Sequence, residues 1–179
     1  MTRKEYNEQV NKALEYFDKA NIVLTDTEKQ SVEVADFGIG KVNELGLQLV
    51  VYINTDRVCA KEMVLLPGQT CPEHKHVPTK GIAGKEETFR CRYGEVYLYV
   101  AGEKNTDSIK ATVPACSKFT VFHEIVLKPG EQYTIMPETW HWFQAGPNGA
   151  VISEFSTRST DETDVFTDEN IIRAPEIEE

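Results

Sequence analysis

The chain has 179 residues, a length that suits one domain with a full hydrophobic core. Its hydrophobic content of 40% excludes a disordered chain, and no apolar run approaches the roughly 18–20 residues that a membrane span needs. The N-terminal residues lack the apolar core of a secretory signal. The four cysteines are scattered without a Cys-x-x-Cys pair, which favours reduced thiols and a cytoplasmic location.

The net charge of −10 comes mainly from the C-terminal end of the chain. Residues 161–179 hold eight acidic residues against one arginine, a local net charge of −7, which leaves −3 for the other 160 residues. Because there is no basic stripe, nucleic acid and anionic membranes are poor partners. The acidic tail, residues 159–179, is interpreted as a solvated surface, although its apolar positions would allow part of it to dock.

A helix is predicted over residues 3–20. Thr2 and Glu5 form a capping-box pattern, and apolar residues then recur at helical spacing, so that one face can pack on the body of the protein. Residues 25–45 are ambiguous. Thr25 and Glu28 again have the capping spacing, residues 31–37 alternate like a strand, and two glycines follow.

From residue 45 to residue 158 the pattern is that of a β-barrel. About eight short segments are rich in β-branched and aromatic residues and are separated by turn residues. The predicted strands cover residues 47–53, 58–66, 88–93, 95–100, 119–127, 132–136, 139–144 and 150–157. Residues 101–118 form the longest predicted loop. So many short strands without intervening helices indicate a closed barrel or jelly roll, and nothing divides residues 1–179 into two domains.

Three histidines and a glutamate form a candidate metal site. His74 and His76 are one residue apart, so that a strand would project both imidazoles to the same face. Alone, such a pair is equally well explained as two hydrogen-bonded side chains near a barrel mouth. Together with Glu87 and His141, it provides three imidazoles and one carboxylate, a ligand set for a first-row divalent metal.

The spacing of these residues resembles the two sequence motifs of the cupin family. Gly68-x5-His74-x-His76 followed by Glu87-x6-Gly94 is similar to the first motif, and the segment from Gly130 through Pro-Glu-Thr-Trp to His141 is similar to the second. This resemblance implies an all-β cupin fold, a double-stranded β-helix or jelly roll, with an N-terminal helix. It also favours Glu87 over the adjacent Glu86 as the ligand. Ten residues separate His76 from Glu87, more than most cupins have.

That expanded loop, the Pro-Glu-Thr-Trp-His-Trp-Phe turn and the closing Glu-Phe-Ser-Thr-Arg-Ser-Thr-Asp-Glu-Thr-Asp-Val-Phe segment resemble the D-lyxose isomerase family of cupins, over roughly residues 45–173. The resemblance implies interconversion of D-lyxose and D-xylulose, weaker action on D-mannose, and a homodimer. It also implies Mn²⁺ as the cofactor, with Co²⁺, Fe²⁺ or Zn²⁺ as alternatives. An isomerase of this kind binds a small monosaccharide.

Four further residues are candidates for catalysis and sugar binding. Glu154, in a predicted strand, is the candidate general base, because a carboxylate among barrel aromatics would have a raised pKa that suits proton transfer. Lys85 is a candidate acid and Lys80 a candidate sugar ligand, although each is also explained as a solvated loop lysine. Strand alternation places Phe143, rather than Trp142, on the face of His141, where it would flank the sugar. His123 is interpreted as a surface residue.

Proton transfer between C2 and C1 through a cis-enediol is the expected mechanism, with a metal-promoted hydride shift as the rival. Two other functions remain open at this point. Three histidines around iron also suit a cupin dioxygenase, although the glutamate ligand argues against it. A non-catalytic sugar-binding cupin is the third hypothesis, for which the sequence offers no helix-turn-helix pattern or basic surface.

Overall fold

The computed structural model describes residues 1–79, 81–173 and 177–178. The elements in chain order are α1 (Arg3–Lys19), α2 (Asp26–Gln30), β1 (Glu33–Ala35), β2 (Leu47–Asn54), β3 (Cys59–Leu65), β4 (Thr70–Lys75), β5 (Glu87–Val100), β6 (His123–Leu127), β7 (Gln132–Ile135), β8 (His141–Ser156), a 3-10 turn (Asp161–Thr163) and β9 (Val165–Phe166). No helix among these described residues is long and apolar enough to cross a membrane.

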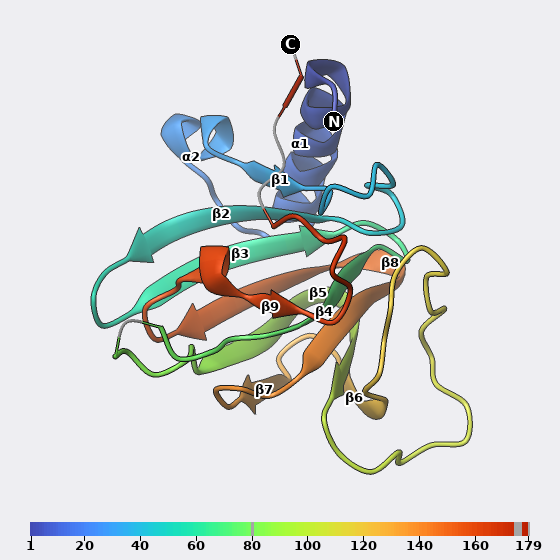
Figure 1. Ribbon diagram of the computed structural model, residues 1–179. Helices are drawn as coiled ribbons and strands as arrows, with labels where there is room; N and C mark the ends of the chain where they lie inside the picture. The colour runs from blue at the N-terminus through green and yellow to red at the C-terminus, as the bar shows by residue number, and fades with distance from the viewer. Residues whose placement is uncertain (80, 174–176, 179) are drawn as a thin grey trace.

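Strand β8 organises the sheet because it pairs with three other strands. One half of β8 pairs with β3 and the other half with β4, while β5 runs antiparallel along both halves. Strands β2 and β1 extend the sheet beyond β3, and β6 and β7 pair with β5. The sheet is therefore rolled into two facing layers (Figure 1). This arrangement confirms the predicted cupin jelly roll.

The N-terminal helix packs on the outside of this roll. Thr2 and Glu5 form the predicted capping box, in which each side chain hydrogen-bonds the other residue's backbone N–H. Alternate residues of the strands face opposite ways, so one set meets the helix and the other fills the barrel. The buried contact with the helix contains Ala13, Tyr16, Phe17, Val50, Val64 and Val151. The helix thus supports the sheet from the side opposite the barrel interior.

Two predicted turns lie inside continuous strands. Gly94 was expected to separate two strands, and residues 146–149 another two, but β5 and β8 run through both positions. The register between β5 and β8 shifts around Gly94, which has a φ of 71°. A Cβ atom at Gly94 would lie 1.9 Å from the carbonyl oxygen of Gly149. The glycine therefore allows close approach of two paired strands, and it does not end a strand.

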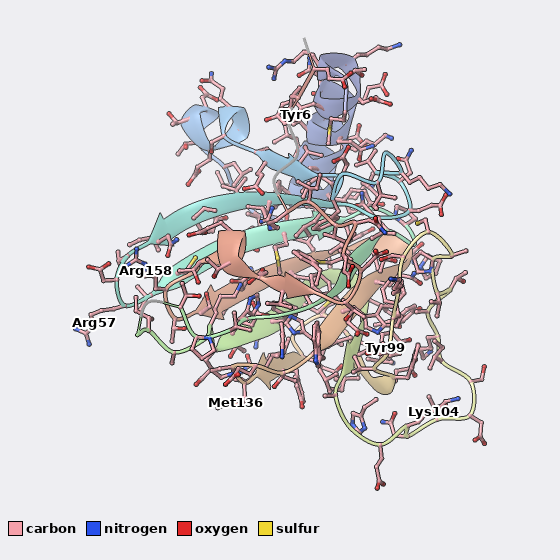
Figure 2. All side chains as sticks on the ribbon, viewed as in Figure 1. Tyr6, Arg57, Tyr99, Lys104, Met136 and Arg158 are labelled. Atoms are coloured by element: carbon pink, nitrogen blue, oxygen red, sulfur yellow. The ribbon has the colours of Figure 1, made fainter. Side chains whose placement is uncertain are left out.

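Other boundaries also differ from the prediction. Residues 70–75, absent from the predicted strands, form β4, whereas residues 119–122 belong to the long loop that precedes β6. This loop, residues 101–122, projects from the roll at the end far from Tyr6, with Lys104 near its tip (Figure 2). The polar character of residues 101–118 correctly predicted its first part.

The interpretation of the acidic tail as a solvated surface holds for Glu162, Glu169 and Glu178, which are exposed, but is wrong for Asp161 and Asp164. Strand β9 of the tail pairs with β4, which places Phe166 opposite His74. The side chains of Asp161 and Asp164 are only 18% and 5% exposed. These acidic residues can be ordered because buried lysines and a histidine face them. The partners lie far apart in the sequence, so no local pattern predicts their pairing. Residues 174–176 and 179 lie outside the described part of the tail.

Candidate metal and sugar site

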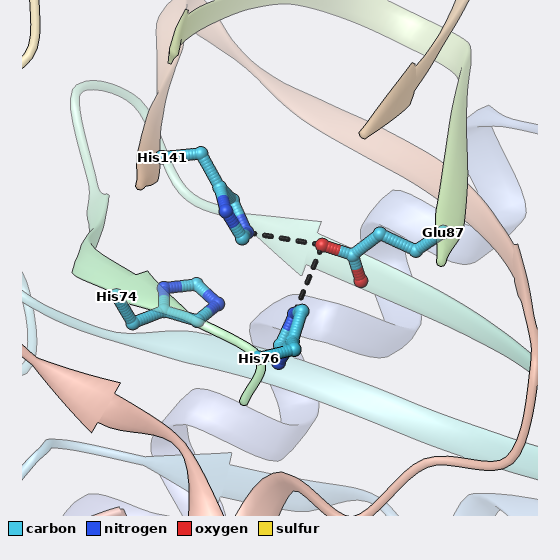
Figure 3. A group of neighbouring side chains, drawn as sticks. All are labelled: His74, His76, Glu87 and His141. Carbon is cyan, nitrogen blue, oxygen red and sulfur yellow. Dashed lines mark hydrogen bonds and ion pairs between the residues drawn. The ribbon is translucent and has the colours of Figure 1, made fainter. Parts of the chain in front are cut away.

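The four predicted ligands come together inside the roll. His74 lies on β4 and His76 directly follows its last residue, Lys75. Glu87 begins β5, and His141 begins β8, where it pairs directly with His74. The Nε2 atoms of His76 and His141 lie 3.1 and 3.0 Å from Oε1 of Glu87 (Figure 3). One ligand atom from each of the four residues lies within 4.8 Å of all the others, and all four residues are buried. The group could hold a metal ion.

Each histidine is oriented by a hydrogen bond at its other ring nitrogen. The Nδ1 atom lies 2.8 Å from the carbonyl oxygen of Pro72 in His74, and 2.9 Å from that of Thr139 in His141. Because a carbonyl oxygen only accepts, each Nδ1 carries the hydrogen and each Nε2 presents a lone pair. Nε2 of His141 is buried and makes no hydrogen bond of suitable geometry, although Oε1 of Glu87 lies 3.0 Å away. Metal-binding histidines are commonly fixed in this way.

The third histidine is oriented by a carboxylate. Nδ1 of His76 lies 2.5 Å from Oδ1 of Asp164, and its Nε2 faces Glu87. Burial opposes a charge on His76, but Glu87 and Asp164 outweigh it and raise the pKa of His76 to about 9. Burial and the two neighbouring imidazoles instead hold the pKa of His74 well below its usual value. The negative charges of Glu87 and Asp164 thus favour a positive charge at this group, as a bound cation would supply.

We call His74, His76, Glu87 and His141 the metal group. A second cluster of charged residues lies beside it. Nζ of Lys85 is 2.8 Å from Oε2 of Glu87, 3.1 Å from Glu154 and 3.0 Å from Asp161. Burial favours the neutral amine, but these carboxylates outweigh it and hold the pKa of Lys85 well above its usual value. Lys61 contacts Asp161 at 2.5 Å and Glu154 at 3.7 Å. We call these four residues, Lys61, Lys85, Glu154 and Asp161, the lysine–carboxylate cluster.

His74, His76 and Glu87 line one cavity together with this cluster, and the remaining wall is largely apolar. Phe143 and Phe89 form part of that wall, with ring centroids 4.9 Å apart in an edge-to-face contact. Trp142 instead stacks on Tyr99 at 4.1 Å in a separate outer cluster. The alternation argument for Phe143 therefore places its ring correctly. The cavity combines residues that could hold a cation, buried charged groups and an aromatic wall.

The structure places the other candidate residues as follows. Glu154 lines the cavity as predicted, but the expected aromatic surroundings are wrong, because two lysines face its carboxylate. Lys85 is a buried residue of the cluster and not a solvated loop lysine. Glu86 is exposed, so only Glu87 faces the histidines. His123 is partly exposed and contacts the backbone of Glu103. Lys80 lies outside the described residues.

Several cavity residues were missed from the sequence. Asp161, Asp164, Phe166 and Arg173 all come from the tail, whose acidic composition resembles that of a solvated surface. The available signal was the apolar pair Val165-Phe166, because apolar residues inside an acidic stretch indicate a segment that packs against the body of the protein. Lys61 had a clearer signal, because it occupies an inward-facing position of the predicted strand 58–66. A charged residue at such a position calls for a buried partner.

Comparison with known proteins identifies the family. The sequence profile described as D-lyxose isomerase matches residues 18–179. The chain belongs to the D-lyxose isomerase family. It is 61% identical to the D-lyxose/D-mannose isomerase of Thermosediminibacter oceani, over 98% of this chain and 96% of that protein. It is 58% identical to the D-lyxose ketol-isomerase of Cohnella laeviribosi, over 99% and 98% of the two chains.

A solved structure shares the fold at much lower sequence identity. The L-ribose isomerase of Cellulomonas parahominis superimposes with a TM-score of 0.78 at 18% identity, covering 97% of this chain and 98% of that one. At this identity the match concerns the fold alone. Family membership makes this protein an isomerase, and it weighs against both the dioxygenase and the non-catalytic hypotheses.

Proposed function

We propose that this protein is a metal-dependent aldose–ketose isomerase that converts D-lyxose to D-xylulose and, more weakly, D-mannose to D-fructose. The observation that carries the proposal is the convergence of three histidines on Glu87, with each Nδ1 atom tied to an oxygen. The names of the relatives support the choice of sugars. Product analysis on a panel of pentoses and hexoses, with and without added Mn²⁺, tests it.

His74, His76, Glu87 and His141 are the proposed metal ligands, and Mn²⁺ is the proposed metal. Four ligands of mixed nitrogen and oxygen type suit a first-row divalent ion and leave about two positions of an octahedron for two sugar oxygens. Co²⁺, Fe²⁺ and Zn²⁺ are the alternatives. When bound, such an ion supplies Lewis-acid chemistry, since it polarises a carbonyl and stabilises negative charge on neighbouring oxygens. Metal analysis of the purified protein, followed by reconstitution with each ion, distinguishes them.

Glu154 is the proposed general base. Its carboxylate lines the cavity, and contacts with Lys85 and Ser156, each 3.1 Å away, fix its direction. In the forward reaction it takes the proton from C2 of the aldose and returns it to C1, so that one carboxylate serves both carbons. Its burial excludes bulk water during the transfer, which favours return of the same proton.

Lys85 is the proposed acid at the sugar oxygens. Isomerisation also moves a proton from O2 to O1, and an ammonium group is a suitable donor of hydrogen bonds to both. Because three carboxylates hold the pKa of Lys85 well above its usual value, this side chain remains positively charged at neutral pH. It therefore stabilises negative charge on oxygen and cannot itself act as the base. Phe143 and Lys80 are proposed sugar contacts, Phe143 through the aromatic wall.

The rival mechanism is a hydride shift from C2 to C1, in which Glu154 never carries the hydrogen. The two routes differ in the fate of that hydrogen. In D₂O, transfer through the cis-enediol introduces deuterium at C1 of the ketose in those turnovers in which the carboxyl proton exchanges with solvent before return. A hydride shift introduces none. Mass spectrometry of the product at partial conversion separates the two routes.

We also propose that the protein is a cytoplasmic homodimer. A cytoplasmic location is supported by its four cysteines, all of which are unpaired. Dimerisation is supported by exposed apolar side chains on β2 and β8, the two strands that flank β3, with Tyr52, Ile53 and Phe155 between 41% and 52% exposed. Light scattering coupled to size-exclusion chromatography measures the mass in solution, and a monomeric mass at micromolar concentration contradicts the dimer.

A further inference from the structure

The cavity adjoins a second hollow through a shared charged wall. The metal cavity and the neighbouring outer pocket are both lined by Leu49, Lys61, Asp161 and Arg173. Beyond this wall, the outer pocket is lined by polar residues that include Asn54, Ser159 and Glu162. The metal group lines only the inner cavity. The shared residues therefore lie between the inner cavity and the more polar outer pocket.

Arg173 completes this wall from the C-terminal tail. Its guanidinium donates to Oε1 of Glu33 at 2.6 Å and lies 3.6 Å from Oδ2 of Asp161. The side chain is 16% exposed. Asp161 is held at shorter distances by Lys61 and Lys85, so its contact with Arg173 is the loosest of those at the wall. Of the three cations around Asp161, Arg173 therefore has the guanidinium or ammonium donors that are least engaged by cavity carboxylates.

The polar groups of the inner cavity indicate where the far end of a sugar lies. One set, the metal group with Asp164, Lys85 and Glu154, surrounds the reacting carbons. The other described polar side chains that line the cavity, a weakly polar cysteine aside, are Lys61, Asp161 and Arg173. Because a buried hydroxyl without a partner is costly, the distal hydroxyls of a bound aldose must face this charged wall and not the phenyl rings.

We propose that Arg173 determines the length of the sugar that the enzyme accepts. Its guanidinium hydrogen-bonds the terminal hydroxyl of a pentose, and the outer pocket receives any further carbon. This inference rests on the proposed isomerase function. D-mannose has the configuration of D-lyxose at C2, C3 and C4 and adds one carbon at the far end, so the two sugars differ only where Arg173 lies.

The test uses the full-length, Mn²⁺-loaded protein with Arg173→Ala. Removing the guanidinium joins the two hollows, so the ratio of kcat/KM for D-mannose over D-lyxose is expected to rise by about tenfold, the scale on which a pocket discriminates one carbon. For D-lyxose, KM should rise while kcat stays within about threefold, because the interaction is remote from the reacting carbons. An unchanged ratio overturns the proposal, as does an equal fall in kcat for both sugars.

Two further variants protect the test against trivial outcomes. Arg158→Ala is the matched control, because Arg158 makes an outward ion pair with Asp56 at 2.7 Å at the edge of the sheet (Figure 2), and its sugar ratio should be unchanged. If Arg173→Ala does not fold, Arg173→Lys keeps the charge with a shorter reach. Its ratio should rise by about threefold, and no change in this variant counts against the proposal.

A binding measurement separates this proposal from the isomerase proposal. D-arabinitol and D-mannitol are the unreactive alditols of the two sugars, and their affinities can be measured by calorimetry. If the wild-type protein isomerises neither sugar, the proposed function is wrong. Arg173→Ala should still improve the affinity for D-mannitol relative to D-arabinitol by about tenfold. Equal changes for both alditols overturn the role of Arg173.

Discussion

The metal group and the lysine–carboxylate cluster line the same cavity, but they are built in different ways. The metal group consists of residues in or directly after the paired strands β4, β5 and β8, and local hydrogen bonds fix the orientation of His74 and His141. The cluster joins Lys61 on β3 and Glu154 on β8, together with Lys85 just before β5, to Asp161 of the tail. The roll therefore supplies the proposed metal ligands, whereas the tail completes the charge balance around Glu154.

Removing a metal ligand should have the largest effect. His141→Ala is expected to lose most of the bound Mn²⁺ and to reduce kcat/KM by about 10⁴-fold, since Lewis-acid stabilisation contributes several kcal/mol. Metal content by mass spectrometry and steady-state kinetics measure the two effects. His123→Ala is the control, because His123 is a partly exposed histidine outside the cavity. Full metal occupancy in His141→Ala would remove this residue from the metal group.

Removing the proposed base should separate metal binding from activity. Glu154→Gln is expected to retain the metal, because Glu154 is not among the four ligands, and to lower kcat by about 10³-fold. Entry of deuterium from D₂O at C1 should slow in parallel. The exposed Glu86 provides the control Glu86→Gln, which should keep wild-type kcat. A fully active Glu154→Gln variant shows that another group is the base.

The same contrast explains how much of the site could be predicted from the sequence. The pattern of the metal group is rare by chance, because it combines a His-x-His pair with one glutamate and one later histidine. The convergence of these four residues was therefore predicted from the sequence. Glu154 was found from strand alternation. Asp161 and Arg173 were not, because their burial depends on charges supplied by Lys61 and Glu33, which lie about a hundred or more residues earlier. In neither pair does the local sequence around one residue predict the other residue as its partner.

The fold divides in a similar way. Alternation and turn residues predicted most strands of the roll, and the capping box predicted α1. Strand ends were predicted less well, because Gly94 signals a turn locally but serves in the structure to let β5 approach Gly149 of β8. That function depends on a strand pair formed over a long sequence separation. Strand β4 was missed as an element because Pro72 interrupts its pattern.

A third prediction concerns the one histidine whose orientation depends on the tail. Asp164→Asn removes the carboxylate 2.5 Å from Nδ1 of His76 while keeping the size of the side chain. Such partners of metal-bound histidines typically contribute 10–100-fold, so we expect Mn²⁺ affinity to fall by about 30-fold. Competition with a fluorescent chelator measures it. Asp107→Asn, in the exposed loop, should match the wild type. Equal affinities in both variants would show that the roll alone fixes His76.

The smallest expected effect tests how firmly the tail is coupled to the roll. Thr167 donates a 2.5 Å hydrogen bond to Glu73 on β4, between the cavity residues Phe166 of the tail and His74 of the roll. Thr167→Val removes this donor, but Glu73 keeps three bonds from Thr120 and Val121. A hydrogen bond to a charged group contributes about 1.5 kcal/mol, so hydrogen exchange in residues 161–173 should quicken by about tenfold.

Activity should respond only weakly to this change. Because the tail remains docked in most molecules after a loss of about 1.5 kcal/mol, we expect KM for D-lyxose to rise by no more than about threefold, with kcat unchanged. Thr106→Val, whose hydroxyl bonds only within the exposed loop, is the control for both measurements. If exchange quickens in the tail while KM and metal affinity stay at wild-type values, docking through Glu73 is independent of the site. The tail would then hold Asp161 and Asp164 in place through their own ion pairs alone.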